Sequence, residues 1–160
     1  MAKVTQRITP FLWFDDRAEE AAKLYVSIFP NSKIRTTARY DEATAKAAGR
    51  PAGSAMTVDF ELDGQGFVAL NGGPHFTFTE AVSFVVNCDT QAEIDHYWDA
   101  LTAGGQEVQC GWLKDRFGLS WQVVPSVLNE LLQGDHEQAK RVMAALMTMT
   151  KLSIAALKDA

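Results

Sequence analysis

A few side chains in this sequence are of the types that perform acid-base or nucleophilic chemistry. His75 lies in a polar connection between two apolar runs, where it is a candidate general base or a ligand contact at a cavity rim; a solvated loop histidine is the alternative. Asp59 and Glu61 share a strand face and would suit an acid-base pair, although a solvent-facing pair explains them more simply. Cys110 precedes two basic residues, Lys114 among them, that would lower its pKa, but it is also typical of a buried strand thiol. No catalytic residue is assigned from the sequence.

Aromatic residues give a second group of candidates. Strand alternation places Phe11 and Trp13 on one face, where they would form an aromatic wall if that face lined a cavity and ordinary core if it did not. Trp112 follows a glycine and is a candidate for stacking on a ligand. Trp121 has the opposite parity to Gln122, which predicts that it lies in the core beneath a helix.

Composition and charge exclude several classes of protein. The chain has 160 residues, 47% of them hydrophobic, which is typical of a globular domain that does not need disulfides. Fifteen basic and twenty acidic residues give a net charge of -5, which disfavours a nucleic-acid partner. No apolar run is long enough to span a membrane, and the first residues lack the apolar core of a signal peptide. Two cysteines at distant positions and no signal peptide favour the reducing cytoplasm.

The positions of these candidates depend on a repeated order of elements. An apolar strand is followed at once by a helix, which Asp16 and Glu19 are expected to cap, and then by an alternating strand and a hairpin with its turn at Asp63-Gly64. Residues 41–54 are expected to form a loop. The strands of this first half are predicted at residues 8–14, 33–40, 56–62 and 67–71.

The same order of elements returns 74 positions later. This shift superposes Asp16 on Thr90 and Glu19 on Glu93, so a second capping box is predicted. Strands are expected at residues 82–88, 108–113 and 119–124, and helices at 126–132, after Asp135 and within 151–160. We therefore expect an α+β fold at residues 1–125 made of two βαβββ modules, 7–73 and 81–125, followed by a helical extension at 126–160.

Three segments carry a family resemblance. ITPFLWFDDRAEEAAKLYVSIFPNSKI, CGWLKDRFGLSWQVVP and KRVMAALMTMTKLSIAALKDA, together with the duplicated unit, resemble the vicinal oxygen chelate superfamily, the glyoxalase and bleomycin-resistance fold. Within it they are similar to the PhnB-like branch, often labelled 3-demethylubiquinone-9 3-methyltransferase. The resemblance implies curved mixed sheets around a cavity, helices on the outer faces, and a homodimer.

The resemblance also implies where a metal ion would bind. Metal-using members hold a divalent ion with a histidine on the first strand of each module and a carboxylate on its last strand. The matching positions here are Thr9 and Ser83 on the first strands and Asn71 and Gln122 on the last. Hydroxyls and neutral amides supply neither the charge nor the imidazole that such ions prefer. We therefore expect no metal and no cofactor.

The function expected from these features is metal-free binding of a small organic molecule by a cytoplasmic homodimer. The predicted ligand contacts are Thr9, Phe11, Trp13, Asn71, His75, Ser83, Trp112 and Gln122. One alternative is an enzyme, either the methyltransferase of the family label or a metal-dependent lyase, isomerase or dioxygenase. The sequence does not support methyltransferase activity, because it has no glycine-rich loop with a downstream acidic residue to hold S-adenosylmethionine. Sequestration of a toxic planar compound without turnover is a further alternative.

Overall fold

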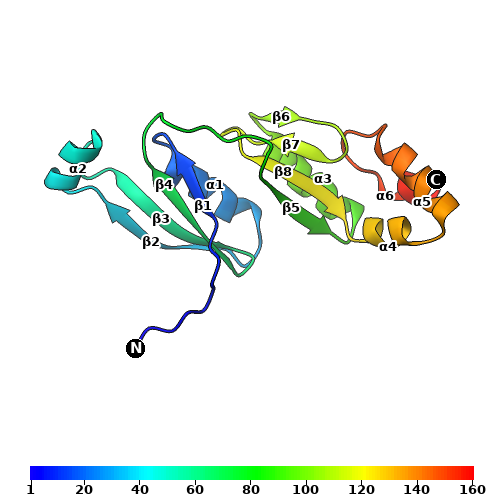
Figure 1. The fold of residues 1–160 in the computed structure, drawn as a ribbon, viewed down its shortest axis with the longest axis horizontal. Helices are drawn as coiled ribbons and strands as arrows, with labels where there is room; N and C mark the ends of the chain where they lie inside the picture. The colour runs from blue at the N-terminus through cyan, green and yellow to red at the C-terminus, as the bar shows by residue number, and fades with distance from the viewer. The chain divides into compact units, whose positions relative to one another are not determined.

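Two four-stranded sheets organise the chain. The computed structural model describes residues 1–160, which form two units, Met1–Thr77 and Phe78–Ala160 (Figure 1). Unit 1 contains β1 (Phe11–Phe14), α1 (Ala18–Ile28), β2 (Lys33–Arg39), α2 (Glu42–Ala48), β3 (Ala55–Leu62) and β4 (Gln65–Asn71). Unit 2 contains β5 (Ser83–Cys88), α3 (Gln91–Thr102), β6 (Gln106–Glu107), β7 (Trp112–Lys114) and β8 (Ser120–Pro125), followed by α4 (Val127–Gln133), α5 (His136–Leu146) and α6 (Ile154–Lys158).

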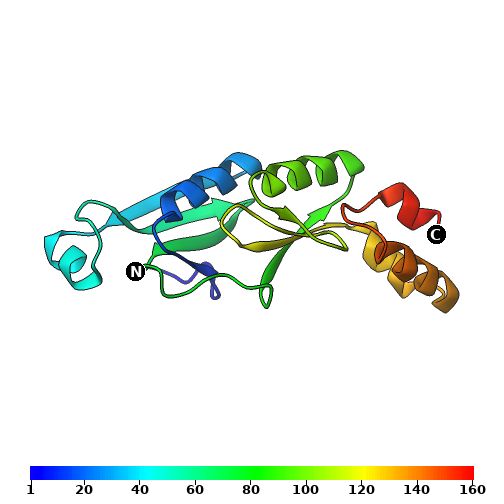
Figure 2. The same cartoon turned by 90° about the horizontal axis from the view of Figure 1, so that it is seen from above.

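The sheet of unit 1 has the order β1-β4-β3-β2, with β1 parallel to β4 and the other neighbours antiparallel. Asp63 and Gly64 both have positive φ in the β3–β4 turn, which matches the right-handed twist of the hairpin and confirms the predicted turn. Helix α1 lies along one face of this sheet (Figure 2), where Tyr25 packs near Phe60. The mixed sheet and its covering helix confirm the α+β class for this unit.

The start of α1 differs from the prediction. The N-cap is Arg17 and makes no side-chain cap, so the capping box predicted for Asp16 and Glu19 is wrong. Instead, the Ala18 backbone N–H donates to Asn71 Oδ1 at 2.8 Å. A helix N-terminus needs acceptors for its first N–H groups, and here one comes from the end of β4, 53 residues away in the chain.

Residues 41–54, expected to be a loop, contain the short helix α2. Asp41 and Thr44 form a capping box, in which Asp41 accepts from the Thr44 N–H at 2.7 Å, and the hydrogen bond lowers the pKa of the Asp41 carboxyl. Gly49 ends the helix in the left-handed conformation, as C-terminal glycines commonly do. The signals for this helix were present in the sequence, but the segment has too few apolar residues to show a helical period.

The sheet of unit 2 has the order β5-β8-β7-β6, and α3 covers one face of it (Figure 2). The capping box of Thr90 and Glu93 is confirmed. The strand predicted at residues 108–113 is wrong, since a turn with positive φ at Cys110 and Gly111 separates β6 from β7. Both modules therefore have three strands after the helix, as the βαβββ unit requires.

The last three helices form a small core of their own within unit 2, built from Leu128, Val142, Leu152 and Leu157. The Gln91 side chain joins this segment to α3: its Nε2 donates to Leu152 O at 3.0 Å and its Oε1 accepts from the Ile154 N–H at 2.9 Å. Ser126 does not cap α4 as predicted, because its hydroxyl donates to Asp89 instead. None of the helices has the length and apolarity needed to cross a membrane.

Candidate functional site

In unit 1, the predicted aromatic wall lies on the sheet face opposite α1. Leu12 and Phe14 are buried on the helix side, whereas Phe11, with the opposite parity, is 60% exposed. Trp13 shares the face of Phe11 and is half-buried. The helix-free face of this sheet therefore presents two aromatic side chains.

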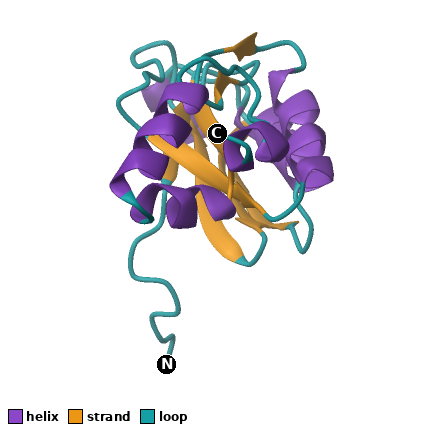
Figure 3. Ribbon diagram, turned by 90° about the vertical axis from the view of Figure 1, so that its right-hand side faces the viewer, coloured by secondary structure: helices purple, strands orange, loops and turns teal.

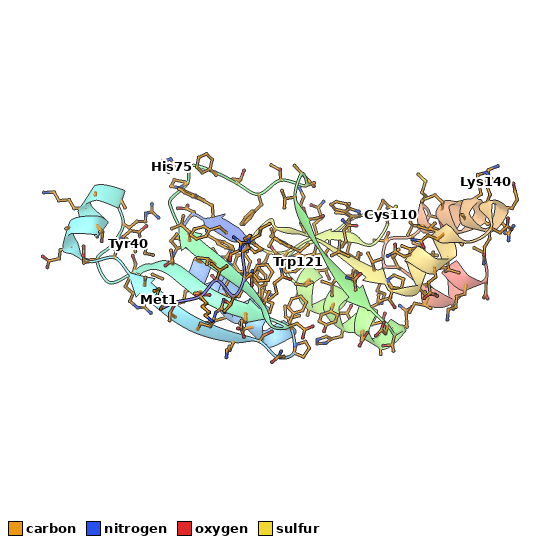
Figure 4. The ribbon with its side chains drawn as sticks, turned by 60° about the horizontal axis from the view of Figure 1, so that its bottom comes forward. Met1, Tyr40, His75, Cys110, Trp121 and Lys140 are labelled. Carbon is orange, nitrogen blue, oxygen red and sulfur yellow. The ribbon has the colours of Figure 1, made fainter.

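The structure brings Trp13 and His75 together. The Trp13 Nε1–H donates to Gly73 O at 2.9 Å, and the indole lies so close to Gly72 that a Cβ there would be 2.2 Å from Trp13 Cζ2. His75, on the loop after β4 (Figure 4), meets the indole edge-on with ring centroids 6.5 Å apart. Phe76 packs against the same ring at 5.0 Å. A glycine at position 72 is required for this arrangement.

Sequence reasoning missed Arg50, which lies beside the same cluster. Its Nη1 donates to Asp15 O at 3.1 Å and to the Asp15 carboxylate at 3.3 Å. The residue follows α2, within the segment expected to be a featureless loop, and nothing in the local pattern marks it. Phe76 was also missed, because a single exposed aromatic in a polar connection carries no periodic signal.

In unit 2, three predicted contacts occupy the sheet face opposite α3. Gln122 Nε2 donates to Ser83 Oγ at 2.9 Å, and Trp112 lies directly across from Gln122 in the β7–β8 pairing. Val85, on the same face, is 48% exposed. Trp121 points the other way, is only 3% exposed, and donates its indole N–H to the buried carboxylate of Asp115 at 2.9 Å (Figure 4). Its predicted core position is confirmed.

Thr9 and Asn71 have different surroundings. Thr9 is exposed and precedes β1, outside the sheet. Figure 3 shows the N-terminal segment of the chain as a loop. Asn71 is 5% exposed, and each polar atom of its amide has a partner: Oδ1 accepts from the Ala18 N–H, and Nδ2 donates to Ala55 O at 3.0 Å. The Asn71 amide thus joins β4 to α1 and to the start of β3, which leaves little of it for a ligand.

Strand register shows that the two last-strand positions are not equivalent. Asn71 pairs with Phe14 at the end of β1, whereas Gln122 pairs with Val85 inside β5. The residue that pairs with the end of β5 is Pro125. Matching the two halves of the sequence cannot detect this difference in strand pairing, because the strands are short and the strands of the two units begin and end at different positions of the repeat.

The remaining candidates for acid-base and nucleophilic chemistry are Asp59, Glu61 and Cys110. Arg35 pairs with Asp59 at 2.9 Å and with Glu61 at 3.1 Å. Because Asp59 and Phe11 both pair with Val68, these two carboxylates lie on the helix-free face of the sheet, the face of Phe11 and Trp13. Cys110 lies in a turn and not in a strand, and its backbone N–H donates to Met149 O at 2.8 Å. Burial raises the pKa of the Cys88 thiol to about 11, and the nearby Glu93 and Asp89 carboxylates add to the shift, so Cys88 stays protonated near neutral pH.

The residues at the superfamily's metal positions do not suit a divalent transition metal. Thr9, Ser83 and Gln122 offer neutral oxygens and nitrogens, and the Asn71 amide is bonded within the protein. Within either unit, no group of three or more His, Cys, Asp or Glu side chains is placed to hold a metal ion.

Comparison with known proteins agrees with the fold. Two βαβββ units, each with a mixed four-stranded sheet, form a glyoxalase-like fold. The family model described as 3-demethylubiquinone-9 3-methyltransferase matches residues 6–124. The chain therefore belongs to this family, the PhnB-like branch of the superfamily. Among curated proteins, no sequence matches it.

Several solved structures are similar to this chain. A putative 3-demethylubiquinone-9 3-methyltransferase, PhnB protein, from Bacillus cereus is 35% identical over 76% of this chain and 100% of its own, with a TM-score of 0.68. Protein PA1353 from Pseudomonas aeruginosa is 20% identical over 76% and 98%, with a TM-score of 0.60. The fosfomycin resistance protein FosX from Listeria monocytogenes is 16% identical over 82% and 100%, with a TM-score of 0.57. The last two likenesses support the fold alone.

Proposed function

We propose that this protein is a cytoplasmic homodimer that binds a small organic molecule without a metal ion. The observation that carries the proposal is the chemistry at the four superfamily metal positions, where hydroxyl and amide groups replace histidine and carboxylate. Binding sites for small molecules combine apolar area with a few oriented polar groups. The helix-free sheet faces supply both, in the two clusters described above.

Each unit carries its own cluster of candidate ligand contacts. In unit 2, Gln122 and Ser83 hold each other at 2.9 Å, so a ligand would meet a donor and an acceptor whose orientations are already fixed, with Trp112 as the adjacent apolar surface. In unit 1, Trp13 is held by its own hydrogen bond to Gly73 and offers a fixed aromatic surface beside His75. Preorganised groups of this kind lose little entropy when a ligand binds.

Native mass spectrometry of untagged protein, purified without chelators, tests the proposal. The expected spectrum is a dimer with no metal and with an organic adduct that supplies a candidate ligand. A monomer would contradict the dimer, and one transition-metal ion per chain would contradict metal-free binding.

Point variants then test the placement of the site. Binding of the copurified molecule should weaken in Gln122→Leu and in Trp112→Leu, while His96→Gln, on the helix side of the same unit, serves as the control. Equal affinity in all three variants would refute the placement on unit 2. The methyltransferase alternative predicts saturable binding of S-adenosylmethionine, measured by isothermal titration calorimetry, and we expect none.

A further inference from the structure

Arg50 presents an unused hydrogen-bonding edge in unit 1. Its Nη1 is bonded to Asp15, but Nε and Nη2 have no hydrogen-bond partner, and Nε is buried. These two nitrogens form the side-on fork of a guanidinium, the edge that binds a carboxylate or phosphate through two parallel hydrogen bonds. Buried donors are nearly always paired, so an unpaired one in a folded chain calls for an explanation.

A second unpaired donor lies beside this fork. His75 makes no hydrogen bond, and its Nε2 is 3.5 Å from the point where a Cβ on Gly73 would be. The Nη2 of Arg50 is 3.4 Å from the same point. Gly73 has a φ of +93°, a conformation that favours glycine, and its missing side chain leaves the space between the two donors open. At most about 7 Å therefore separates the two nitrogens.

One oxyanion can bridge such a separation. Charge-assisted N–H···O bonds are about 2.8 Å long, and two oxygens of one carboxylate or phosphate can each accept from a different donor. Asp15 holds the guanidinium in place through Nη1 and leaves the other edge to an incoming anion. The adjacent rings of Trp13 and Phe76, the latter 65% exposed, offer apolar contact to the rest of such a molecule.

We propose that Arg50 and His75 form an oxyanion-binding site on unit 1, with Trp13 and Phe76 as the aromatic surface for the organic part of the ligand. The ligand class is a small aromatic or aliphatic molecule with a terminal carboxylate or phosphate. This inference rests on the proposed small-molecule function, because it states where the anionic group of the ligand binds. It also adds a residue, Arg50, that belongs to none of the positions matched to the superfamily.

The test is a titration of the full-length protein by two-dimensional NMR, following the Arg50 Nε–H and the Trp13 indole N–H. The probes are phenyl phosphate, benzoate, inorganic phosphate and the neutral benzyl alcohol. Saturable shifts of both signals are expected with phenyl phosphate or benzoate at a Kd below about 10 mM. Tighter binding of one of the two identifies the anion as phosphate or carboxylate. Weaker binding of inorganic phosphate would assign part of the affinity to the aromatic surface.

Four variants make the result specific. Arg50→Gln should weaken binding by about tenfold or more, because a charge-assisted fork is lost, and Arg50→Lys should restore only part of it. His75→Gln tests the second donor without risk to the fold, since His75 is exposed and unbonded. Arg39→Gln, which removes the same charge elsewhere on unit 1, should leave the affinity unchanged.

Two outcomes would overturn the site. One is equal affinity of the wild type and Arg50→Gln for every probe, and the other is the absence of saturable shifts with all anionic probes. In the first of these cases the probes would still bind, so the oxyanion site would be refuted while small-molecule binding remained intact. If the native spectrum showed a bound metal ion but phenyl phosphate still bound in an Arg50-dependent manner, the proposed metal-free function would be refuted and the oxyanion site would stand.

Discussion

Asn71→Ala separates a structural role for this side chain from a ligand contact. The substitution removes the acceptor of the Ala18 N–H and the donor to Ala55 O, and both backbone residues are buried. Loss of a helix cap costs about 1 kcal/mol. A buried backbone group left unpaired costs about 1–3 kcal/mol. We therefore expect the free energy of unfolding of unit 1 to fall by about 2–4 kcal/mol.

Native-state hydrogen exchange measures this loss in the right part of the chain. The two units need not unfold together, so a single melting temperature would mix them, whereas the exchange of the Ala69 amide in β4 reports on unit 1. Thr90→Ala is the matched control in unit 2, since it removes an exposed local cap and should cost about 1 kcal/mol.

The reasoning would be refuted if Asn71→Ala cost no more than Thr90→Ala. A variant of unchanged stability that had lost affinity for the copurified molecule would instead identify Asn71 as a ligand contact. The backbone carbonyl of Asn71, which accepts from Tyr40 Oη at 2.7 Å, is kept in the alanine variant and does not complicate the comparison.

Three further outcomes follow from the structure. Gly72→Ala should displace the Trp13 indole and cost unit 1 about 1–3 kcal/mol; an unshifted indole N–H signal in NMR would contradict this. Gln91→Ala should speed hydrogen exchange at the Ile154 amide by about tenfold, and an unchanged rate would show that the apolar core alone holds the last helices. Burial raises the pKa of the Cys88 thiol from its ordinary value of 9.0 to about 11 in the folded chain. As the pH rises, this thiol therefore loses its proton in the unfolded state before it does so in the folded state. Stability should therefore fall by about 2 kcal/mol between pH 9 and 11, a slope that Cys88→Ala should lack in urea unfolding.

Local patterns in the sequence were sufficient for most elements of the fold. Alternation along β3 and β4, the Asp63-Gly64 turn and the Thr90–Glu93 box each act over a few residues, so their signals are complete within the segment that forms them. The duplicated order of elements and the family motifs then indicated the superfamily, which the family model and the structure support.

The errors arose where local signals were weak or interrupted. The α2 helix has little apolar surface, and its cap signal at Asp41 was overlooked. A strand was predicted through Cys110 because apolar residues continue on both sides, but positive φ at two successive residues turns the chain there. Neither feature changes the order of the elements, so the fold class was predicted correctly in spite of both.

The candidate sites depended on contacts that no local pattern encodes. The sequence by itself determined which residue types stand at the metal positions of the superfamily and which strands carry aromatic side chains. Only the tertiary structure decided that Asn71 caps a helix 53 residues away, that Gln122 meets Ser83, and that Arg50 lies near His75. The physical reason is that periodicity fixes the face on which a side chain lies, whereas its partners depend on strand register and on loops that fold back, which are set by the packing of the whole unit.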